Sequence, residues 1–167
     1  MAEPNKGHGD LQQVIIYTDG ACDPNPGIGG WAAILLHPDS GKRTEISGGD
    51  PESTNNRMEL TAVLEALQRL KGKCGVTIHT DSQYVKNAFT AGWLKSWQAK
   101  GWKTASKEPV KNRDLWEKLL EAVNQHVVAW QWIRGHHVDP LNNRCDELAV
   151  AARKKIAAEM RSGKLSA

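Results

Sequence analysis

Four acidic residues occupy positions from which a folded chain can gather carboxylates into one place: Asp19, Glu59, Asp81 and Asp146. Asp19 and Asp81 each follow a run of β-branched and apolar residues, 14–18 and 76–80, that predicts a strand. The other two fall in the first turns of segments with helical spacing. Because reactive groups in α/β proteins gather at the carboxyl ends of strands, we expect the four acids to converge at one edge of a sheet.

Such a cluster favours divalent cations as its chemical partner. Like charges a few ångströms apart raise one another's pKa, and bound cations relieve the repulsion. Carboxylate oxygens suit hard ions, Mg²⁺ or Mn²⁺, rather than zinc. Two such ions about 3.5–4 Å apart can clamp the attacking and leaving oxygens of a phosphodiester. Acids at strand ends are also common and solvated, and composition alone favours four unrelated acids among the nineteen present.

A histidine is placed to complement this chemistry. His136 follows the strand predicted over 127–133 and precedes Asp146 by ten residues. A mobile imidazole beside a metal site can carry protons to or from a leaving group. Taken alone, His136 or its neighbour His137 is more often a plain surface side chain.

Positive charge is concentrated in the segment 93–113, WLKSWQAKGWKTASKEPVKNR. Its six basic residues against one acid give a local charge of +5, more than the +3 of the whole chain. Concentrated positive charge beside aromatic rings suits a nucleic-acid backbone. The candidate contacts are Trp93, Trp97, Lys100, Trp102, Lys103 and Lys107. The alternative is a solvated helix above a small tryptophan core.

Several uncharged polar side chains are expected near the same rim of the sheet. They are Asn25, Thr54, Asn55, Asn56 and Gln83. Residues of these types can contact sugar 2′-hydroxyls or bind phosphates. Thr54 and Asn55 can also cap the helix predicted over 54–70, and capping is compatible with binding because a helix N-terminus attracts phosphate.

The elements that must position these residues follow a simple order. Three strands joined by short connections, typical of an antiparallel meander, are predicted over 14–18, 31–36 and 42–48. The remaining elements are helix 54–70, strand 76–80, helix 82–91, a helix about 115–123, strand 127–133 and a helix of about 142–160. Because the later strands alternate with helices, they are expected to pair in parallel, which makes the fold α/β with a mixed sheet.

Length and composition predict one ordinary globular domain of the 167 residues. We expect it to span 11–160, between a flexible N-terminal segment, 1–10, and a flexible tail, 161–167. Three cysteines without CxxC spacing argue against a disulfide framework or a zinc knuckle, and favour reduced thiols in a cytoplasmic protein. With no run of about 20 apolar residues, we expect no association with a membrane.

Short motifs along the chain occur in one consistent order. They lie at 17–20, 25–27, 54–60, 80–85, 101–104, 110–112, 114–116, 135–136 and 144–149. In sequence and order these motifs resemble type 1 ribonuclease H, in particular its bacterial ribonuclease HI form. The resemblance covers about residues 14 to 152, nearly the whole chain.

The resemblance implies a ribonuclease H-like fold, with a five-stranded mixed sheet, three antiparallel strands and then two parallel ones, flanked by helices. It implies an endonuclease that hydrolyses the RNA strand of RNA–DNA hybrids and leaves 5′-phosphate and 3′-hydroxyl ends. Two Mg²⁺ ions are the expected cofactors, with Mn²⁺ as a substitute. The expected partner is the hybrid, and we expect the protein to be a monomer.

Roles for particular residues also follow from the resemblance. The metal ligands are expected to be the four carboxylates together with the backbone of Gly20, and the catalytic histidine to be His136. A pocket for a DNA phosphate is implied at Asn25, Thr54 and Arg57. Contacts with ribose hydroxyls are implied at Asn55, Asn56 and Gln83. The segment 93–113 corresponds to the family's basic handle, and aromatic residues along the DNA channel are implied at Trp93 and Trp116.

Two departures from the family pattern lie close to Asp146. The loop reads Gly-His-His-Val-Asp-Pro over 135–140, where many bacterial relatives have Gly-His-x-Gly-His, which puts the loop's mobility in doubt. Asn143 stands where relatives often have an acid, so metal preference can differ. Two other functions stay open: a hybrid-binding module that is catalytically weak, and another nuclease of the superfamily. The intact carboxylates weigh against the former, and the motif 54–60 and the basic handle weigh against the latter.

Overall fold

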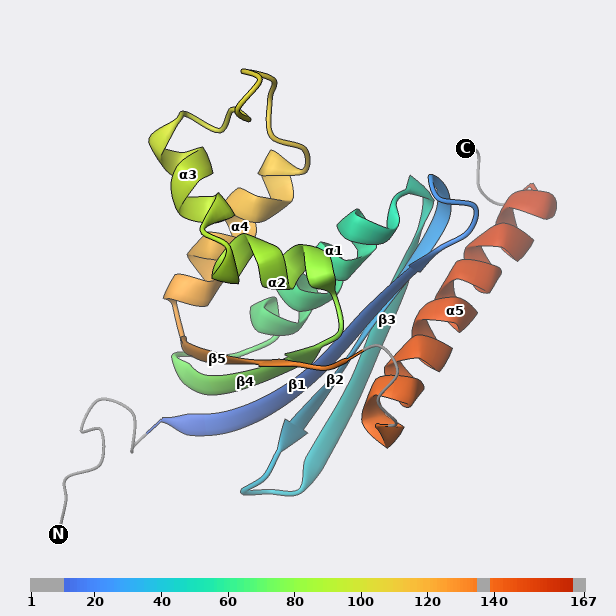
Figure 1. Cartoon of the computed structure of the whole chain (residues 1–167). Coiled ribbons are helices and arrows are strands. Elements are labelled where there is room, and N and C mark those ends of the chain that lie inside the picture. The colour runs from blue at the N-terminus through green and yellow to red at the C-terminus, as the bar shows by residue number, and fades with distance from the viewer. Residues whose placement is uncertain (1–10, 135–138, 164–167) are drawn as a thin grey trace, which may run out of the picture.

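The computed structural model describes residues 11–134 and 139–163. At its centre is a five-stranded sheet in the order β3-β2-β1-β4-β5 (Figure 1). The strands are β1 Gln12–Cys22, β2 Gly27–His37, β3 Lys42–Ser53, β4 Cys74–Thr80 and β5 Val127–Trp132. The first three pair antiparallel, and β4 and β5 extend the sheet in parallel with β1. The predicted mixed sheet is therefore confirmed.

Helices cover both faces of this sheet. They are α1 Asn55–Gln68, α2 Gln83–Thr90, α3 Trp93–Ala99, α4 Arg113–Asn124 and α5 Pro140–Arg161. In Figure 1, α5 runs along one side of β1–β3, while α1 lies on the other side with α4 packed against it. The main hydrophobic core fills the α1 side, where apolar side chains of β1 and β4 meet those of α1 and α4. This core fixes the layer from which the edge residues of the sheet emerge.

Glycines in the central strands let α5 approach its face of the sheet closely. A Cβ atom built on Gly30 would lie 2.1 Å from the carbonyl oxygen of Ala149, and one built on Gly49 would lie 2.3 Å from Ile156. Real Cβ contacts are never this short, so a larger residue at either position would push the helix away. The glycines of β2 and β3 therefore help to set the position of the helix that bears Asp146.

The strands of the meander are longer than the sequence pattern predicted. Asp19 was expected just after a strand, but it lies inside β1, where it pairs with Ala32. The apolar run does end at Thr18, yet pairing with β2 continues to Cys22 because one neighbouring strand is enough to hold the backbone. In β2, the strand was predicted to begin at residue 31, because the segment 27–30 contains three glycines and has no side-chain pattern that indicates a strand. The short helix α3 was also not predicted as an element.

Candidate active site

One pocket of about 460 Å³ gathers all four of the predicted carboxylates. Its lining residues come from β1, α1, α2, α5 and the turn after β4. They are Asp19, Gly20, Asn55, Asn56, Glu59, Asp81, Ser82, Gln83, Tyr84 and Asp146. We call this site the acid pocket. The convergence expected from the sequence is therefore present, and three of the five predicted polar rim residues line the same pocket.

Strand register brings the first two acids to the same level. Tyr17 of β1 pairs with His79 of the parallel strand β4. Asp19 and Asp81 each follow that pair by two residues, so they emerge side by side at the carboxyl ends of neighbouring strands, as α/β topology favours. Although Asp19 lies inside β1, it is already beyond the stretch that pairs with β4.

Close packing of β1 against α1 positions the third acid. A Cβ atom on Gly20 would lie 2.6 Å from the backbone nitrogen of Glu59, so a glycine is required at that crossing. The helix begins at a well-formed N-cap, since the Thr54 hydroxyl accepts a hydrogen bond of 3.1 Å from the backbone N–H of Arg57. The Asn25 side-chain oxygen accepts another, also of 3.1 Å, from the N–H of Asn55. These contacts fix the turn of α1 from which Glu59 projects.

The fourth acid is carried by α5, which is anchored on both of its flanks. The buried Cys145 thiol donates to the carbonyl oxygen of Tyr17 at 3.3 Å. On the other flank, the Arg144 guanidinium donates to both carboxylate oxygens of Glu45 in β3, at 3.0 Å each. These contacts hold the second turn of the helix against β1 and β3, and Asp146 lies exposed at the mouth of the acid pocket.

Burial and mutual repulsion disfavour the ionised forms of three of these acids, Asp19, Glu59 and Asp81. Burial, followed by the charge of Asp81, raises the pKa of Asp19 to about 8, although the Gly20 N–H that donates to its carboxylate works in the opposite direction. Burial also raises the pKa of Glu59 to about 7, partly opposed by the Ser82 side chain. The pKa of Asp81 is raised mainly by burial, with a contribution from Asp146. The pocket therefore retains protons near neutral pH unless positive charge enters it.

The donor chemistry of the acid pocket fits hard divalent cations. Among the described residues, the Oε2 atom of Glu59 is buried and has no hydrogen-bond partner. A buried oxygen in that state is costly unless a cation or another donor satisfies it. In the part of the chain that the structure describes, no three Asp, Glu, His or Cys side chains lie close enough together to coordinate one metal ion without further ligands. The carboxylate oxygens that line the pocket are the donors that hard divalent ions prefer.

The basic handle folds locally around its tryptophans. After α3, the Trp102 N–H donates to the carbonyl oxygen of Trp97 at 2.6 Å, and the Val110 N–H donates back to that of Trp102 at 3.0 Å. A groove beside α3 is lined by Trp93, Trp97, Lys100 and Lys103, among others. Within the described part of the chain, none of the handle lysines forms a salt bridge. Their charges are thus available to a polyanion.

The structure corrects one predicted contact and qualifies two others. Trp116 is fully buried, so direct contact with a nucleic acid is wrong for this side chain; its Nε1–H instead donates to the Tyr84 hydroxyl at 3.0 Å. Trp102 is also nearly buried, at 9% exposure. The predicted phosphate ligand Arg57 is already paired with Asp114 through two hydrogen bonds of 3.1 and 2.9 Å.

Two residues that line the acid pocket were missed, and one predicted residue lies outside the described part of the chain. Ser82 and Tyr84 were not named from the sequence, although both fall within three residues of Asp81. Their signal was available, because a strand followed at once by a helix places the first helical turn beside the strand end. His136 lies in 135–138, outside the described residues.

Similarity to known proteins agrees with this geometry. The family model of RNase H matches residues 11–154. Ribonuclease HI of Pseudomonas aeruginosa strain PAO1 is 56% identical over 140 residues, which cover 84% of this chain and 93% of that protein. Ribonuclease H of Moorella thermoacetica is 52% identical over 142 residues, 85% of this chain and 92% of the relative.

Solved structures show the same fold. LC9-RNase H1, described as a type 1 RNase H with the type 2 active-site motif, is 32% identical with a TM-score of 0.76; the match covers 87% of this chain and 74% of that one. LC11-RNase H1, solved in complex with an RNA/DNA hybrid, is 26% identical with a TM-score of 0.60; the match covers 85% and 97% of the two chains.

A mixed sheet with acids at the ends of its central parallel strands, together with these relatives, defines a nuclease of the ribonuclease H class. The chain belongs to the RNase H family. Among the helices of the described residues, none has the length and apolar character needed to cross a membrane.

Proposed function

We propose that this enzyme cuts the RNA strand of RNA–DNA hybrids at the acid pocket, leaving 5′-phosphate and 3′-hydroxyl ends. The observation that carries the proposal is the meeting of Asp19, Glu59, Asp81 and Asp146 in one pocket with three amide side chains on its rim. The hybrid-bound structure of LC11-RNase H1, which shares the fold, supports the choice of substrate.

We further propose that the four carboxylates hold two Mg²⁺ ions, for which Mn²⁺ can substitute, with the backbone of Gly20 beside them. When bound, such ions would supply an activated water and offset charge on the leaving oxygen. The protein's own contribution is to hold acids with raised pKa values at a fixed spacing. Cations are then favoured because they replace protons and relieve like-charge repulsion.

Selection of the two strands is assigned to different parts of the surface. Asn55, Asn56 and Gln83 line the acid pocket, where their amides can contact the ribose hydroxyls that distinguish RNA from DNA. Asn25 and Thr54 shape the N-terminus of α1, a favourable place for a DNA phosphate. Arg57 lies in the same first turn, and it would exchange its pair with Asp114 for the phosphate.

The basic handle is proposed to bind the DNA strand. Trp93 and Trp97 offer partly exposed rings beside Lys100 and Lys103. Lys107 is exposed in the same segment, and Trp102, although nearly buried, is proposed to add to this surface. Trp116 contributes from inside, since it holds the Tyr84 hydroxyl at the acid pocket. Binding by such a surface depends on salt because each neutralised phosphate releases counterions.

His136 is proposed to shuttle a proton to or from the leaving oxygen, which suits an imidazole located in the sequence between β5 and α5. The chain is proposed to act as one domain over 11–160, and as a cytoplasmic monomer. Its three cysteines are free thiols, in keeping with a reducing compartment.

A cleavage assay on a labelled RNA–DNA hybrid tests the proposed activity. With Mg²⁺ we expect internal cleavage of the RNA strand only, with products that a 5′-phosphate-dependent exonuclease can degrade. Excess chelator should abolish the reaction, and duplex DNA should stay intact. A pure preparation that binds the hybrid but leaves it uncut would instead identify a hybrid-binding module.

A further inference from the structure

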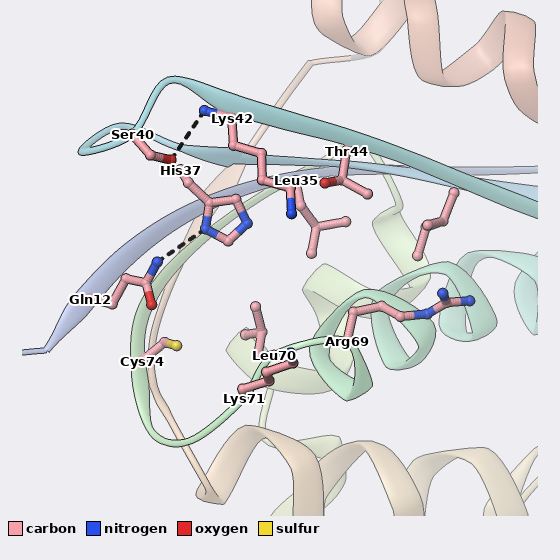
Figure 2. A pocket seen from close by; sticks show the side chains of 11 residues that line it. Gln12, Leu35, His37, Ser40, Lys42, Thr44, Arg69, Leu70, Lys71 and Cys74 are labelled. Carbon is pink, nitrogen blue, oxygen red and sulfur yellow. Dashed lines mark hydrogen bonds between the residues drawn. The ribbon is translucent and has the colours of Figure 1, made fainter.

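A second pocket lies at the end of the sheet opposite the acid pocket. Its volume is about 400 Å³, and it opens between the β2–β3 hairpin and the C-terminal end of α1 (Figure 2). Gln12, at the start of β1, lines it, whereas Asp19 lies seven residues further along the strand. At about 3.3 Å per residue the two pockets are roughly 23 Å apart. We call this second site the basal pocket.

The basal pocket has a basic rim. Lys42, Arg69 and Lys71 line it, and no acid is among its described lining residues. No salt bridge within the described part of the chain includes Lys42 or Lys71. The nearest carboxylate to Arg69 is Glu65, at a long 3.9 Å. Three positive charges thus surround a concave site without close neutralising partners, which favours an anionic ligand.

A histidine adds a directed hydrogen-bond donor to this rim. The Gln12 side-chain nitrogen lies 3.3 Å from Nδ1 of His37, and the contact is drawn in Figure 2. In this arrangement the amide nitrogen donates and Nδ1 accepts, which corresponds to the tautomer with its proton on Nε2. The ring therefore presents an N–H from its other side, and the hydroxyls of Ser40 and Thr44 lie along the same hairpin.

The floor of the basal pocket is apolar. Leu35, Ile46, Leu70 and Cys74 line its inner part, and Leu35 and Cys74 are each only 2% exposed. An inorganic anion would leave this floor in contact with water, whereas a ligand with a flat apolar ring would cover it. Ligand sites commonly combine an apolar lining with a few convergent polar groups in this way.

We propose that the basal pocket binds a small organic phosphate monoester whose ring system packs on Leu35 and Leu70 and whose phosphate meets Lys42 and Lys71. A nucleoside monophosphate has this chemistry. The ligand would bridge α1 and the β2–β3 hairpin, so it stabilises the folded protein by binding the folded state alone. This inference does not depend on the proposed cleavage reaction.

Adenosine monophosphate, titrated into the full-length protein in excess chelator, is a suitable probe. Without cations the acid pocket repels phosphate, and two-dimensional NMR shows which amides respond. We expect saturable shifts at Leu35, Thr44 and Leu70 with little change at Asp81 and Gln83, and a raised melting temperature. Shifts confined to the acid pocket or the handle, or no saturation up to about 10 mM, which corresponds to a free energy of only about −2.7 kcal/mol, would overturn the proposal.

Matched charge variants and simpler ligands test each half of the site. Lys42→Gln with Lys71→Gln should weaken binding at least tenfold, whereas Lys154→Gln with Lys155→Gln, an equal charge change on the exposed face of α5, should leave it within twofold. Equal losses in both double variants would show non-specific attraction. Adenosine and inorganic phosphate should each bind at least tenfold more weakly than the monophosphate. If inorganic phosphate binds as tightly, the site is a plain anion site and the proposed ring contact is wrong.

Discussion

The acid pocket and the basic handle achieve their charge in opposite ways. The pocket takes its four carboxylates from elements as distant in the sequence as β1 and α5, and brings like charges together, three of them partly buried. The handle draws its lysines from one continuous segment and leaves them exposed around packed tryptophans. The pocket therefore depends on global topology and on each of its members, whereas the handle depends on local folding and distributes its effect over many weak contacts.

The largest expected effect is the loss of one acid-pocket carboxylate. In metalloenzymes, mutation of a residue that only hydrogen-bonds to a metal ligand lowers metal affinity or activity about 10–100-fold. Because Asp81→Asn removes a proposed ligand itself, it should lower kcat by at least about a hundredfold. Thermal unfolding should show equal or higher stability because like-charge repulsion falls. The exposed Asp39→Asn, in the β2–β3 turn, is the control. Undiminished activity in Asp81→Asn would remove this residue from the site.

Neutralising the handle should produce a smaller effect of a different kind. With Lys100, Lys103 and Lys107 all changed to Gln, we expect KM for the hybrid to rise about tenfold while kcat changes little. The slope of log binding constant against log salt concentration should become shallower by about 2 to 3 units, since about 0.9 counterions are released per phosphate contact. The control is a variant with an equal change of charge elsewhere on the surface, in which Lys118, Lys154 and Lys155 are all changed to Gln. A slope equal to that of the wild type would contradict DNA binding by the handle.

The raised pKa values predict how stability depends on pH in the absence of metal. Asp19 and Glu59 bind protons in the folded state up to about pH 8 and 7, respectively, but in the unfolded state only to about pH 4. The folded state holds more protons between these limits, so stability falls as pH rises from about 4 to 8. Each kcal/mol lost lowers Tm by about 2–4 °C in a domain of this size.

Differential scanning calorimetry in chelator, at several pH values, measures this dependence. The Asp19→Asn variant should show a weaker fall of Tm with pH, and saturating Mg²⁺ should also flatten it. If Tm of the wild type rose steadily from pH 5 to 8 in chelator, the result would contradict the raised pKa values of Asp19 and Glu59.

The smallest expected effects come from two tryptophans, one with a structural role and one with a role in binding. Trp116→Phe removes a buried hydrogen bond to Tyr84 and leaves a cavity, which should cost about 1–3 kcal/mol of stability. Trp93→Ala alters a side chain that is 37% exposed, and should change stability by less than about 0.5 kcal/mol while it raises KM a few-fold. Urea unfolding and hybrid kinetics on both variants separate the two roles. A larger stability loss in Trp93→Ala would reverse them.

The sequence predicted the parts of the fold that side-chain periodicity encodes. Alternating strands and helices predicted the element order correctly apart from the short helix α3, and the placement of acids beside strand ends correctly predicted their convergence. Strand length was underestimated because backbone pairing, not side-chain pattern, extends β1 through Asp19 and β2 through its glycines. Such pairing depends on a neighbour that is distant in the sequence, so no local pattern reports it.

The side-chain environments were harder to predict than the backbone. Trp116 lies in the family motif beside exposed basic residues, yet it is completely buried, with the rings of Tyr84, Phe89 and Trp97 packed against it. Arg57 was predicted to bind phosphate, but the pair with Asp114 depends on the approach of two helices. The basal pocket likewise arises between a hairpin and a helix end, with Gln12 and Cys74 brought together by strand register. Such contacts between distant elements cannot be predicted from composition or from the spacing of residues.

Paramagnetic broadening by Mn²⁺ tests most directly whether the four carboxylates form one metal site. Trace Mn²⁺ is added to isotope-labelled protein, and the backbone amide signals are followed by NMR. We expect the amides of Gly20, Glu59, Asp81 and Asp146 to lose intensity together, before any others, and to recover when excess Mg²⁺ is added. Broadening that spreads evenly over exposed acids, or that reaches only one of these four positions, would contradict a shared site.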